Sequence, residues 1–307
     1  MEYMKRFFIT LCLLFFTFAA FAEKITMISF NMGGKSRTVP QVAQMILDSR
    51  ADVAFLQEIW VKAPQNKALR EMTTLLGESE WDFAVTSSYM LTEITTVGEE
   101  TYKSGNNGQN NAIIYNRKKL SLTDLADEIG FTRFSGEFLF DKNHVQLVRL
   151  SLQTAPEKQI VAINVHLPYT DKAHRARDLA TLERLYARYK LRFGVIIAGD
   201  FNYQRKILTT RNFDFVDGTE RWFSDRNYGI ATTISTKGEG YVLFANDYDH
   251  FVFSPKITVI EEMHRALSAG REKHCPRIQF GQTVYTSSTE FRKEVSDHVP
   301  IVMAVEM

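Results

Sequence analysis

Six short stretches of this sequence place polar side chains of related chemistry at the ends of apolar, strand-like runs. They read SFN at 29–31, QE at 57–58, NVH at 164–166, GDFN at 199–202, YD at 248–249 and SDH at 296–298. Together they supply carboxylates, amides and imidazoles, with no cysteine. One such residue at the end of a buried strand is unremarkable, whereas six of them indicate one shared rim. We therefore expect these groups to meet in a reactive site.

The side chains expected at this rim are Asn31, Glu58, His166, Asp200, Asn202, Asp249, Asp297 and His298. Carboxylate and amide oxygens in this number suit Mg²⁺, Mn²⁺ or Ca²⁺ far better than zinc. Imidazoles beside such a cation, with a carboxylate to orient one of them, suit proton transfer at an oxygen nucleophile. Phosphoester cleavage needs these parts together, because a cation neutralises the phosphate while a base activates water.

The N-terminus carries the pattern of a secretory signal peptide. Lys5 and Arg6 precede an apolar run over 7–21, and Ala20-Phe21-Ala22 forms a small-x-small cleavage site. We expect a signal peptide over 1–22 and export of the remaining chain to the periplasm or the medium. The apolar run is shorter than the roughly 20 residues of a bilayer span, so no stable membrane association is expected after cleavage.

Composition narrows the remaining options. The chain has 307 residues, of which 45% are hydrophobic and 24% charged, as in globular proteins. Its formal net charge of +1 gives no global basic field that would point to nucleic acid or an anionic membrane. Cys12 would leave with the signal peptide, so Cys275 has no cysteine partner for an intramolecular disulfide.

Apolar patterning predicts a chain that alternates strands and helices and then becomes strand-rich. Predicted strands cover 24–32, 52–60, 81–89, 111–116, 145–152, 158–167, 194–202, 248–254, 256–263 and 300–306, and predicted helices cover 38–50, 66–77 and 170–189. The Gly- and Asn-rich stretch 98–111 predicts a loop. Because no linker or repeat interrupts the pattern, we expect one domain over 23–307. The fold class is α/β (α+β), a four-layer sandwich of two packed mixed β-sheets flanked by helices.

The motifs, in their order along the chain, resemble the signatures of the endonuclease/exonuclease/phosphatase superfamily of metal-dependent phosphoesterases. The resembling stretches are SFN, LQE, NVHL, GDFN, YDHFVFS and SDHVPI, and the resemblance runs from Ile25 to Glu306. Each motif alone is weakly specific. GDFN at 199–202 followed by SDHVPI at 296–301 is the most specific combination.

The resemblance implies a role for each residue. Glu58 resembles the principal metal ligand, with Asn31 beside it, and Asp297 a metal-facing or supporting acid. Asp200 and Asn202 resemble the pair that positions the attacking water and the phosphate. His298 resembles the base or phosphate-binding imidazole, Asp249 the carboxylate that holds its tautomer, and His166 the acid toward the leaving oxygen.

Within the superfamily the nearest resemblance is to secreted deoxyribonucleases of the pancreatic type, carried by residues 231–254. It implies a Mg²⁺-dependent, Ca²⁺-assisted endonuclease that takes DNA as its substrate. Where those nucleases support the equivalent of His166 with a glutamate, this chain has Gln109 and Asn110. Among nearby basic residues, Arg205 and Lys206 are candidates for contacts with flanking phosphates, and Gln109 is a further candidate for substrate contact.

Three other functions remain open from the sequence. A secreted phospholipid phosphodiesterase, such as a sphingomyelinase, or a phosphoinositide phosphatase would use the same metal chemistry. Either would need an apolar hairpin for the bilayer, and the aromatic stretch 131–141 keeps that alternative open. A non-catalytic binding module is disfavoured by the intact set of acidic and imidazole groups.

Overall fold

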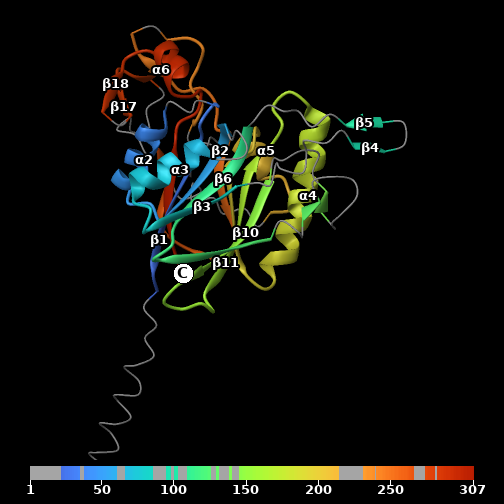
Figure 1. Cartoon of the computed structure of the whole chain (residues 1–307). Coiled ribbons are helices and arrows are strands. Elements are labelled where there is room, and N and C mark those ends of the chain that lie inside the picture. Colours follow the sequence, from blue (N-terminus) through green and yellow to red (C-terminus); the bar gives the residue numbers. More distant parts are fainter. Residues whose placement is uncertain are drawn as a thin grey trace, which may run out of the picture.

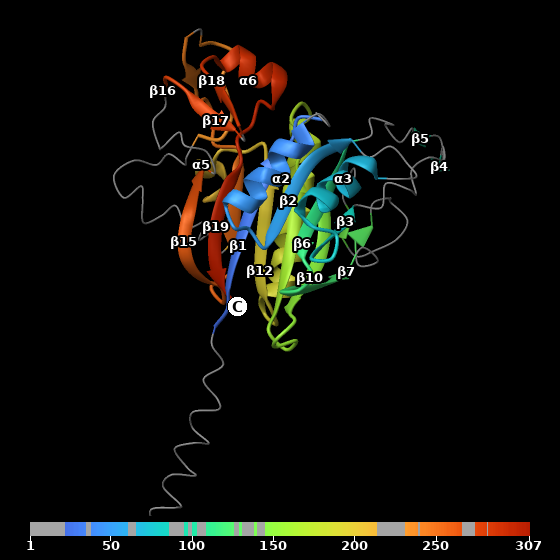
Figure 2. The same ribbon diagram turned by 60° about the vertical axis from the view of Figure 1, so that its left-hand side comes forward.

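A computed structural model describes residues 22–34, 38–60, 66–85, 95–97, 100–102, 109–125, 129–130, 138–139, 145–213, 231–238, 240–265, 274–280 and 282–307. Its core is a pair of β-sheets packed face to face with helices on both outer faces (Figures 1 and 2). None of the helices within these ranges combines the length and apolar character needed to cross a membrane.

The larger sheet has six strands in the order β15-β19-β1-β2-β6-β3, and the smaller has five in the order β14-β12-β11-β10-β7. In chain order these strands are β1 Lys24–Asn31, β2 Val53–Trp60, β3 Trp81–Val85, β6 Gln109–Asn116, β7 Leu120–Asp124, β10 Val145–Leu152, β11 Gln159–His166, β12 Gly194–Asp200, β14 Asp249–Phe253, β15 Thr258–Arg265 and β19 Ile301–Glu306. Each sheet has one parallel pair, β1 with β2 and β11 with β12, among antiparallel pairs. Both sheets are therefore mixed, as predicted.

The helices are α2 Val39–Asp48, α3 Lys67–Leu76, α4 Lys172–Lys190, α5 Arg205–Leu208 and α6 Ser288–Glu294. Short paired strands complete the structure: β4 Thr95–Val97 with β5 Glu100–Tyr102, β8 Ile129–Gly130 with β9 Phe138–Leu139, β13 Val242–Leu243 with β16 His274–Cys275, and β17 Ile278–Phe280 with β18 Thr283–Tyr285. The strands β17 and β18 and the helix α6 project together beyond one end of the sandwich (Figure 2).

Three apolar clusters hold the layers together. The middle cluster lies between the sheets and includes Phe55, which meets Phe251 edge to face with ring centroids 6.4 Å apart. A second cluster packs α2 and α3 onto the outer face of the larger sheet. The third packs α4 onto the smaller sheet through the buried Leu179, Leu182 and Leu185, the helix face expected from their spacing. Three clusters separate four layers, so the predicted four-layer sandwich is confirmed.

The sequence predictions differ from the structure at loops and in elements that were not predicted, among them β7, α5 and α6. The stretch 98–111 was expected to be a loop, but Glu100–Tyr102 forms β5 and β6 begins at Gln109. Thr101 and Tyr102 favour strands, whereas Asn110 and Asn111 disfavour them and are held in β6 by backbone pairing with a neighbouring strand. Thr38 precedes α2 as expected of an N-cap, yet its side chain makes no capping hydrogen bond. The predicted strand residues 86–89 lie outside the described ranges.

A buried amide network joins the two sheets beneath one rim. The Asn164 side chain, on β11, donates from Nδ2 to the backbone carbonyls of Leu56 (3.1 Å) and Ala112 (3.0 Å) in the other sheet. Its Oδ1 accepts from Gln57 Nε2 at 2.8 Å. The register of β2 against β6 shifts between Leu56 and Ile59, so a β-bulge lies at this point. Asn164 therefore satisfies carbonyls beside the bulge and couples the sheets there.

We expect Asn164→Leu to lower the free energy of unfolding by about 2–6 kcal/mol, because it leaves two buried carbonyls without their amide donor. Urea unfolding followed by circular dichroism measures this loss. Asn212→Leu, at an exposed site after α5, is the matched control and should change stability by less than about 0.5 kcal/mol. Equal stabilities for the two variants would contradict this account of the network.

Candidate active site

Strand direction brings the predicted polar groups to one rim. β11 and β12 run parallel and end at His166 and Asp200, which are register partners. β14 runs antiparallel to β12, so its first residue, Asp249, lies opposite Asp200. In the larger sheet β1 ends at Asn31, and β19 runs antiparallel to it and follows His298. With β2, which runs parallel to β1 and carries Glu58 near its end, the carboxyl ends of four strands and the starts of two others meet, as predicted.

Glu58 reaches the site through an unusual backbone conformation. Its φ is +51°, one of four positive values among the described non-glycine residues. A non-glycine residue in this region costs about 1–3 kcal/mol and persists where the surroundings hold it. The bulge in β2 produces this turn, and Gly34 N–H donates to the Glu58 carbonyl at 3.0 Å. The strand thus directs the Glu58 carboxylate to the rim.

Asp200 is the buried centre of the site. Its side chain is 1% exposed, and its Oδ1 accepts the Asn202 backbone N–H at 2.8 Å. Asn202, at φ +51°, donates from Nδ2 to the Leu167 carbonyl at 2.7 Å and lies 3.3 Å from Asp200 Oδ2. A Cβ at Gly199 would lie 2.0 Å from the Val165 carbonyl oxygen, so only glycine lets β12 approach β11 here.

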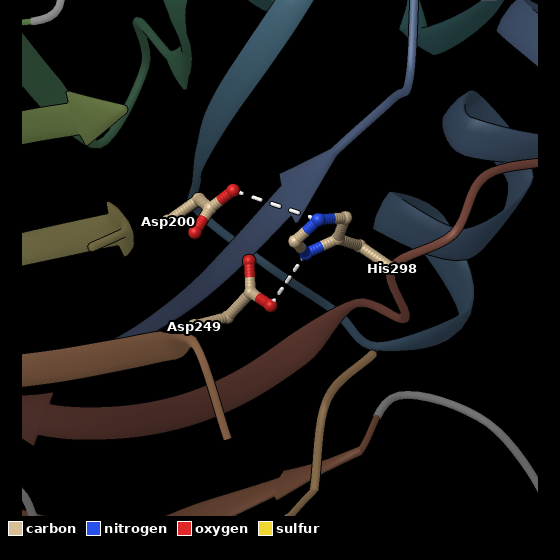
Figure 3. Close-up of side chains that lie close together, drawn as sticks. All are labelled: Asp200, Asp249 and His298. Atoms are coloured by element: carbon tan, nitrogen blue, oxygen red, sulfur yellow. Dashed lines mark hydrogen bonds and ion pairs between the residues drawn. The ribbon is translucent and has the colours of Figure 1, made fainter. Parts of the chain in front are cut away.

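The His298 imidazole lies between two carboxylates. Its Nδ1 is 2.8 Å from Asp249 Oδ2, and its Nε2 is 3.5 Å from Asp200 Oδ2 (Figure 3). The Asp249 backbone N–H in turn donates to Thr232 Oγ1 at 3.0 Å. Asp249 therefore orients the ring of His298 and directs Nε2 toward Asp200. This is the pairing that the motifs predicted.

His166 stands on the other side of Asp200. Its Nε2 lies 3.4 Å from Glu58 Oε1 and 3.8 Å from Asp200 Oδ2. The side chains of His166 and Glu58 are 16% and 21% exposed, whereas that of Asp200 is buried. The two imidazoles thus approach one carboxylate, with His166 and Glu58 at the opening. This geometry suits a reaction that needs one proton removed and another supplied.

The site shifts the pKa values of these groups in different directions. Burial lowers the pKa of His166 below its ordinary 6.5. For His298 burial acts in the same sense, but Asp249 and Asp200 outweigh it and raise the pKa to about 10. Burial raises the pKa of Asp200 to about 6 and also raises that of Glu58. The protein without a bound cation therefore holds His298 as an imidazolium and His166 as a neutral ring.

We expect NMR titration of the imidazole nitrogens in EDTA to find His298 charged and His166 neutral at pH 8. The hydrogen bond and the charge of Asp249 raise the pKa of His298, whereas burial is the largest effect on His166 and lowers its pKa. Asp249→Asn should bring the pKa of His298 down, because it removes the larger of the two attractive charges. Two histidines that titrate together near 6.5 would contradict this electrostatic picture.

The same shifts predict how the stability of the metal-free protein depends on pH. The raised pKa of His298 stabilises the fold fully below pH 6.5, and this contribution is lost as the pH rises toward about 10. Because the pKa of Asp200 is raised from 3.8 to about 6, its contribution to stability is lost between those two pH values and does not change further above pH 6. Between pH 6.5 and 10 stability should fall by up to about 1.4 kcal/mol per pH unit as His298 loses its proton. Thermal unfolding in EDTA measures this, and a flat profile would contradict it.

The residues fit a hard divalent cation. Three carboxylates from Glu58, Asp200 and Asp249 share the site, and burial raises the pKa of the Glu58 and Asp200 carboxyls because it disfavours their charged forms. Asp249 Oδ1 is buried and has no hydrogen-bond partner among the described residues. Asp200, Asp249 and His298 also present ligand atoms within 4.8 Å of one another. Because His298 already bonds Asp249, Glu58 and Asp200 are the carboxylates that could hold a cation at this rim.

Two predicted metal residues make other contacts. Asn31 Nδ2 donates to Glu58 Oε1 and Asp200 Oδ2, both at 3.1 Å, and its Oδ1 accepts Gly33 N–H at 2.9 Å. In this arrangement Asn31 spaces the two carboxylates, and its role as an oxygen ligand stays a prediction. The Asp297 carboxylate is half exposed and pairs with Arg292 Nη2 at 3.4 Å. That contact favours the supporting role over the metal-facing one.

The residues predicted to contact the substrate differ in their exposure to solvent. Lys206 is exposed on α5. Arg205 is 8% exposed, and its backbone N–H donates to Asp247 Oδ2 at 3.1 Å, so its side chain offers little surface to a phosphate. Gln109 pairs with Trp60 in β6, but its side chain lies outside the described residues. His250 is buried, and its Nε2 lies 3.0 Å from the Tyr203 carbonyl.

Two positioning residues were not singled out from the sequence. Ser296 is fully buried; its Oγ donates to the Asn31 carbonyl at 2.7 Å and accepts His298 N–H at 3.1 Å. Thr232 Oγ1 accepts the N–H groups of Tyr248 and Asp249. Ser296 stands directly before Asp297 in the motif, and Thr232 belongs to a Thr/Ser cluster, so both signals were present. Their partners are distant in sequence, which hid the roles.

A two-sheet sandwich whose rim collects carboxylates around two imidazoles has the groups that metal-assisted phosphoester hydrolysis uses. The family model described as Endonuclease/Exonuclease/phosphatase family matches residues 28–298, and the chain belongs to this family. It is thus a hydrolase of phosphoesters. No curated protein matches the sequence.

Several solved structures share the fold. An endonuclease/exonuclease/phosphatase family protein from Bacteroides thetaiotaomicron matches with a TM-score of 0.59 at 15% identity, over 93% of this chain and 98% of that one. A mannosyl-6-phosphatase from the same bacterium gives 0.57 at 15%, over 92% and 99%. D. rerio TDP2 humanized by 14 mutations gives 0.57 at 14%, over 92% and 99%. At these identities the similarity establishes the fold.

Proposed function

We propose that this chain is a secreted, Mg²⁺-dependent phosphodiesterase of the deoxyribonuclease-like type, which cuts DNA internally. The observation that carries the proposal is the placement of two imidazoles around one buried carboxylate, with opposite pKa shifts. In-line cleavage of a diester needs a base for the attacking water and an acid for the leaving alkoxide. His298 and His166 supply one group for each end of that path.

Each side chain has a defined task in this reaction. Glu58 would hold the cation, with Asp200 beside it. The cation would neutralise charge on the phosphate and reduce the negative potential that keeps His298 protonated. Asp249 keeps the tautomer of His298 that presents Nε2 to the substrate. Asn202, whose Nδ2 donates to the Leu167 carbonyl and to Asp200 Oδ2, would orient the Asp200 carboxylate beside the phosphate.

Secretion belongs to the same proposal. The predicted cleavage after Ala22 leaves Glu23 as the first residue, and Glu23 exchanges backbone hydrogen bonds of 3.0 Å with Met307. Processing at this point therefore leaves β1 and its pairing intact. Mass spectrometry of the protein recovered from the periplasm or the medium should give a chain that starts at Glu23. Recovery of the unprocessed chain from the cytoplasm would overturn this part of the proposal.

Cleavage of supercoiled plasmid by the purified protein tests the activity. Nicked circles that form with Mg²⁺ and not with EDTA support an endonuclease. Sphingomyelin vesicles, a phosphoinositide and a sugar monophosphate are assayed in parallel under the same conditions. Turnover of one of these with the plasmid intact would replace DNA by that substrate and keep the phosphoesterase class.

The phospholipid alternative depended on the aromatic stretch 131–141. Of this stretch the structure describes only Phe138–Leu139, which forms β9.

A further inference from the structure

An aromatic side chain stands exposed beside the catalytic rim. Tyr169 follows His166 by three residues and is 64% exposed, the largest value for an aromatic side chain within the described ranges. Its ring centroid lies 6.5 Å from that of Tyr248, with the ring planes at 57°. Tyr248 directly precedes Asp249, and its carbonyl accepts Phe201 N–H at 2.9 Å. The two rings, here called the tyrosine pair, therefore adjoin the ends of β11, β12 and β14.

The segment that carries Tyr169 is held in place. Arg175 Nη1 donates to the Tyr169 carbonyl at 3.0 Å. Asp171 caps α4 by accepting the N–H groups of Ala173 and His174 at 3.0 and 2.9 Å. An exposed ring on a fixed turn loses little conformational freedom when a ligand stacks on it. The tyrosine pair is therefore preorganised as a binding surface.

Positive charge lies next to the tyrosine pair. The Arg175 guanidinium carbon is 4.6 Å from the centroid of the Tyr203 ring, and Tyr203 follows Asn202. Arg175 Nε is buried without a hydrogen-bond partner among the described residues. Proteins that bind single-stranded nucleic acid combine positive charge, which contacts the phosphate backbone, with aromatic rings, on which the bases stack. Arg175 thus links the tyrosine pair to the site of Asp200 and Asn202.

We propose that the tyrosine pair stacks an unpaired nucleobase next to the scissile phosphate, so that the enzyme cuts single-stranded DNA in preference to duplex. The inference rests on the proposed function and narrows its substrate. In a duplex the bases stack on one another and expose only their edges in the grooves. An unpaired base offers a whole face to Tyr169, whereas a paired base would first have to leave its stack.

The experiment compares cleavage of a labelled single-stranded oligonucleotide, the same strand in a duplex, and the single strand with abasic positions around the cut. Wild type, Tyr169→Ala and Tyr169→Phe are assayed with Mg²⁺, with Tyr241→Ala as the control at another exposed tyrosine. Loss of one base–aromatic stack should reduce the single-strand to duplex ratio of kcat/KM for Tyr169→Ala by about 5- to 100-fold. The effect should appear in KM, and Phe should retain the ratio.

The loss of kcat/KM caused by removing the bases and the loss caused by removing the Tyr169 ring should not be additive, because each change abolishes the same contact. The inference would be overturned if Tyr169→Ala had the same ratio of kcat/KM on the normal strand to kcat/KM on the abasic strand as the wild type. Equal cutting of single strand and duplex by the wild type would also overturn it. If the wild type cuts no nucleic acid, the proposed function fails. Fluorescence anisotropy with the same oligonucleotides in EDTA then decides the stacking site by itself, since equal binding by wild type and Tyr169→Ala excludes it.

Discussion

His298→Ala is expected to lower the rate of Mg²⁺-dependent plasmid cleavage by about 10²–10⁴-fold, the usual contribution of an acid–base group. The ring is buried between Asp249 and Asp200, and its Nε2 is the atom that would exchange a proton at the rim. Thermal unfolding should show that the fold persists, because the ring contacts site carboxylates rather than the apolar clusters. The measurement is kcat by quantified conversion of supercoiled to nicked plasmid.

Two further variants make the result specific to the site. Asp249→Asn keeps the shape of the side chain and should reduce kcat with a shifted pH profile, because the amide no longer favours a charged His298. His174→Ala removes an exposed histidine of α4, paired with Asp171 at 3.2 Å, and should leave the rate unchanged. If His298→Ala retained more than about a tenth of the wild-type rate, the assignment of His298 would be wrong.

Glu58→Gln is expected to raise the Mg²⁺ concentration that gives half-maximal activity by more than about 100-fold. Loss of a residue that only orients a metal ligand already lowers metal affinity by about 10–100-fold. The amide keeps the size of the side chain but removes a charge next to Asp200. The amide oxygen can still accept the bond from Asn31 Nδ2, which lies 3.1 Å from Glu58 Oε1, so the loss of charge is the main change. Titration of activity with Mg²⁺, and of the apparent melting temperature, measures the loss.

Asp297→Asn is the matched control for the metal. Its carboxylate pairs with Arg292 at the half-exposed edge of the site, so its loss should change the Mg²⁺ midpoint far less than Glu58→Gln. Equal losses would place Asp297 in the metal site, as the SDH motif by itself allowed. An unchanged midpoint in Glu58→Gln would remove Glu58 from that role.

The sequence by itself determined most of the long elements and the kind of chemistry, but not β7, α5 or α6. Apolar runs such as 145–152 and 194–200 are long and β-branched, and they form β10 and β12. The polar residues that end the strands, such as Asn31 and Asp200, could be recognised because they interrupt apolar patterns. These are local patterns. They predict the strands of the folded protein because strand formation and burial have the same periodicity.

Only the tertiary structure decided how the site works. The bulge that turns Glu58 to the rim depends on pairing with β6, and Asn164 supports it from a strand more than a hundred positions away in the sequence. Burial and neighbouring charge, which no local pattern contains, separate the pKa values of His166 and His298. Tyr169 became a candidate binding residue only when its exposure and its distance from Tyr248 were known. Contacts between residues far apart in the sequence decide geometry and charge state, whereas local periodicity decides the elements alone.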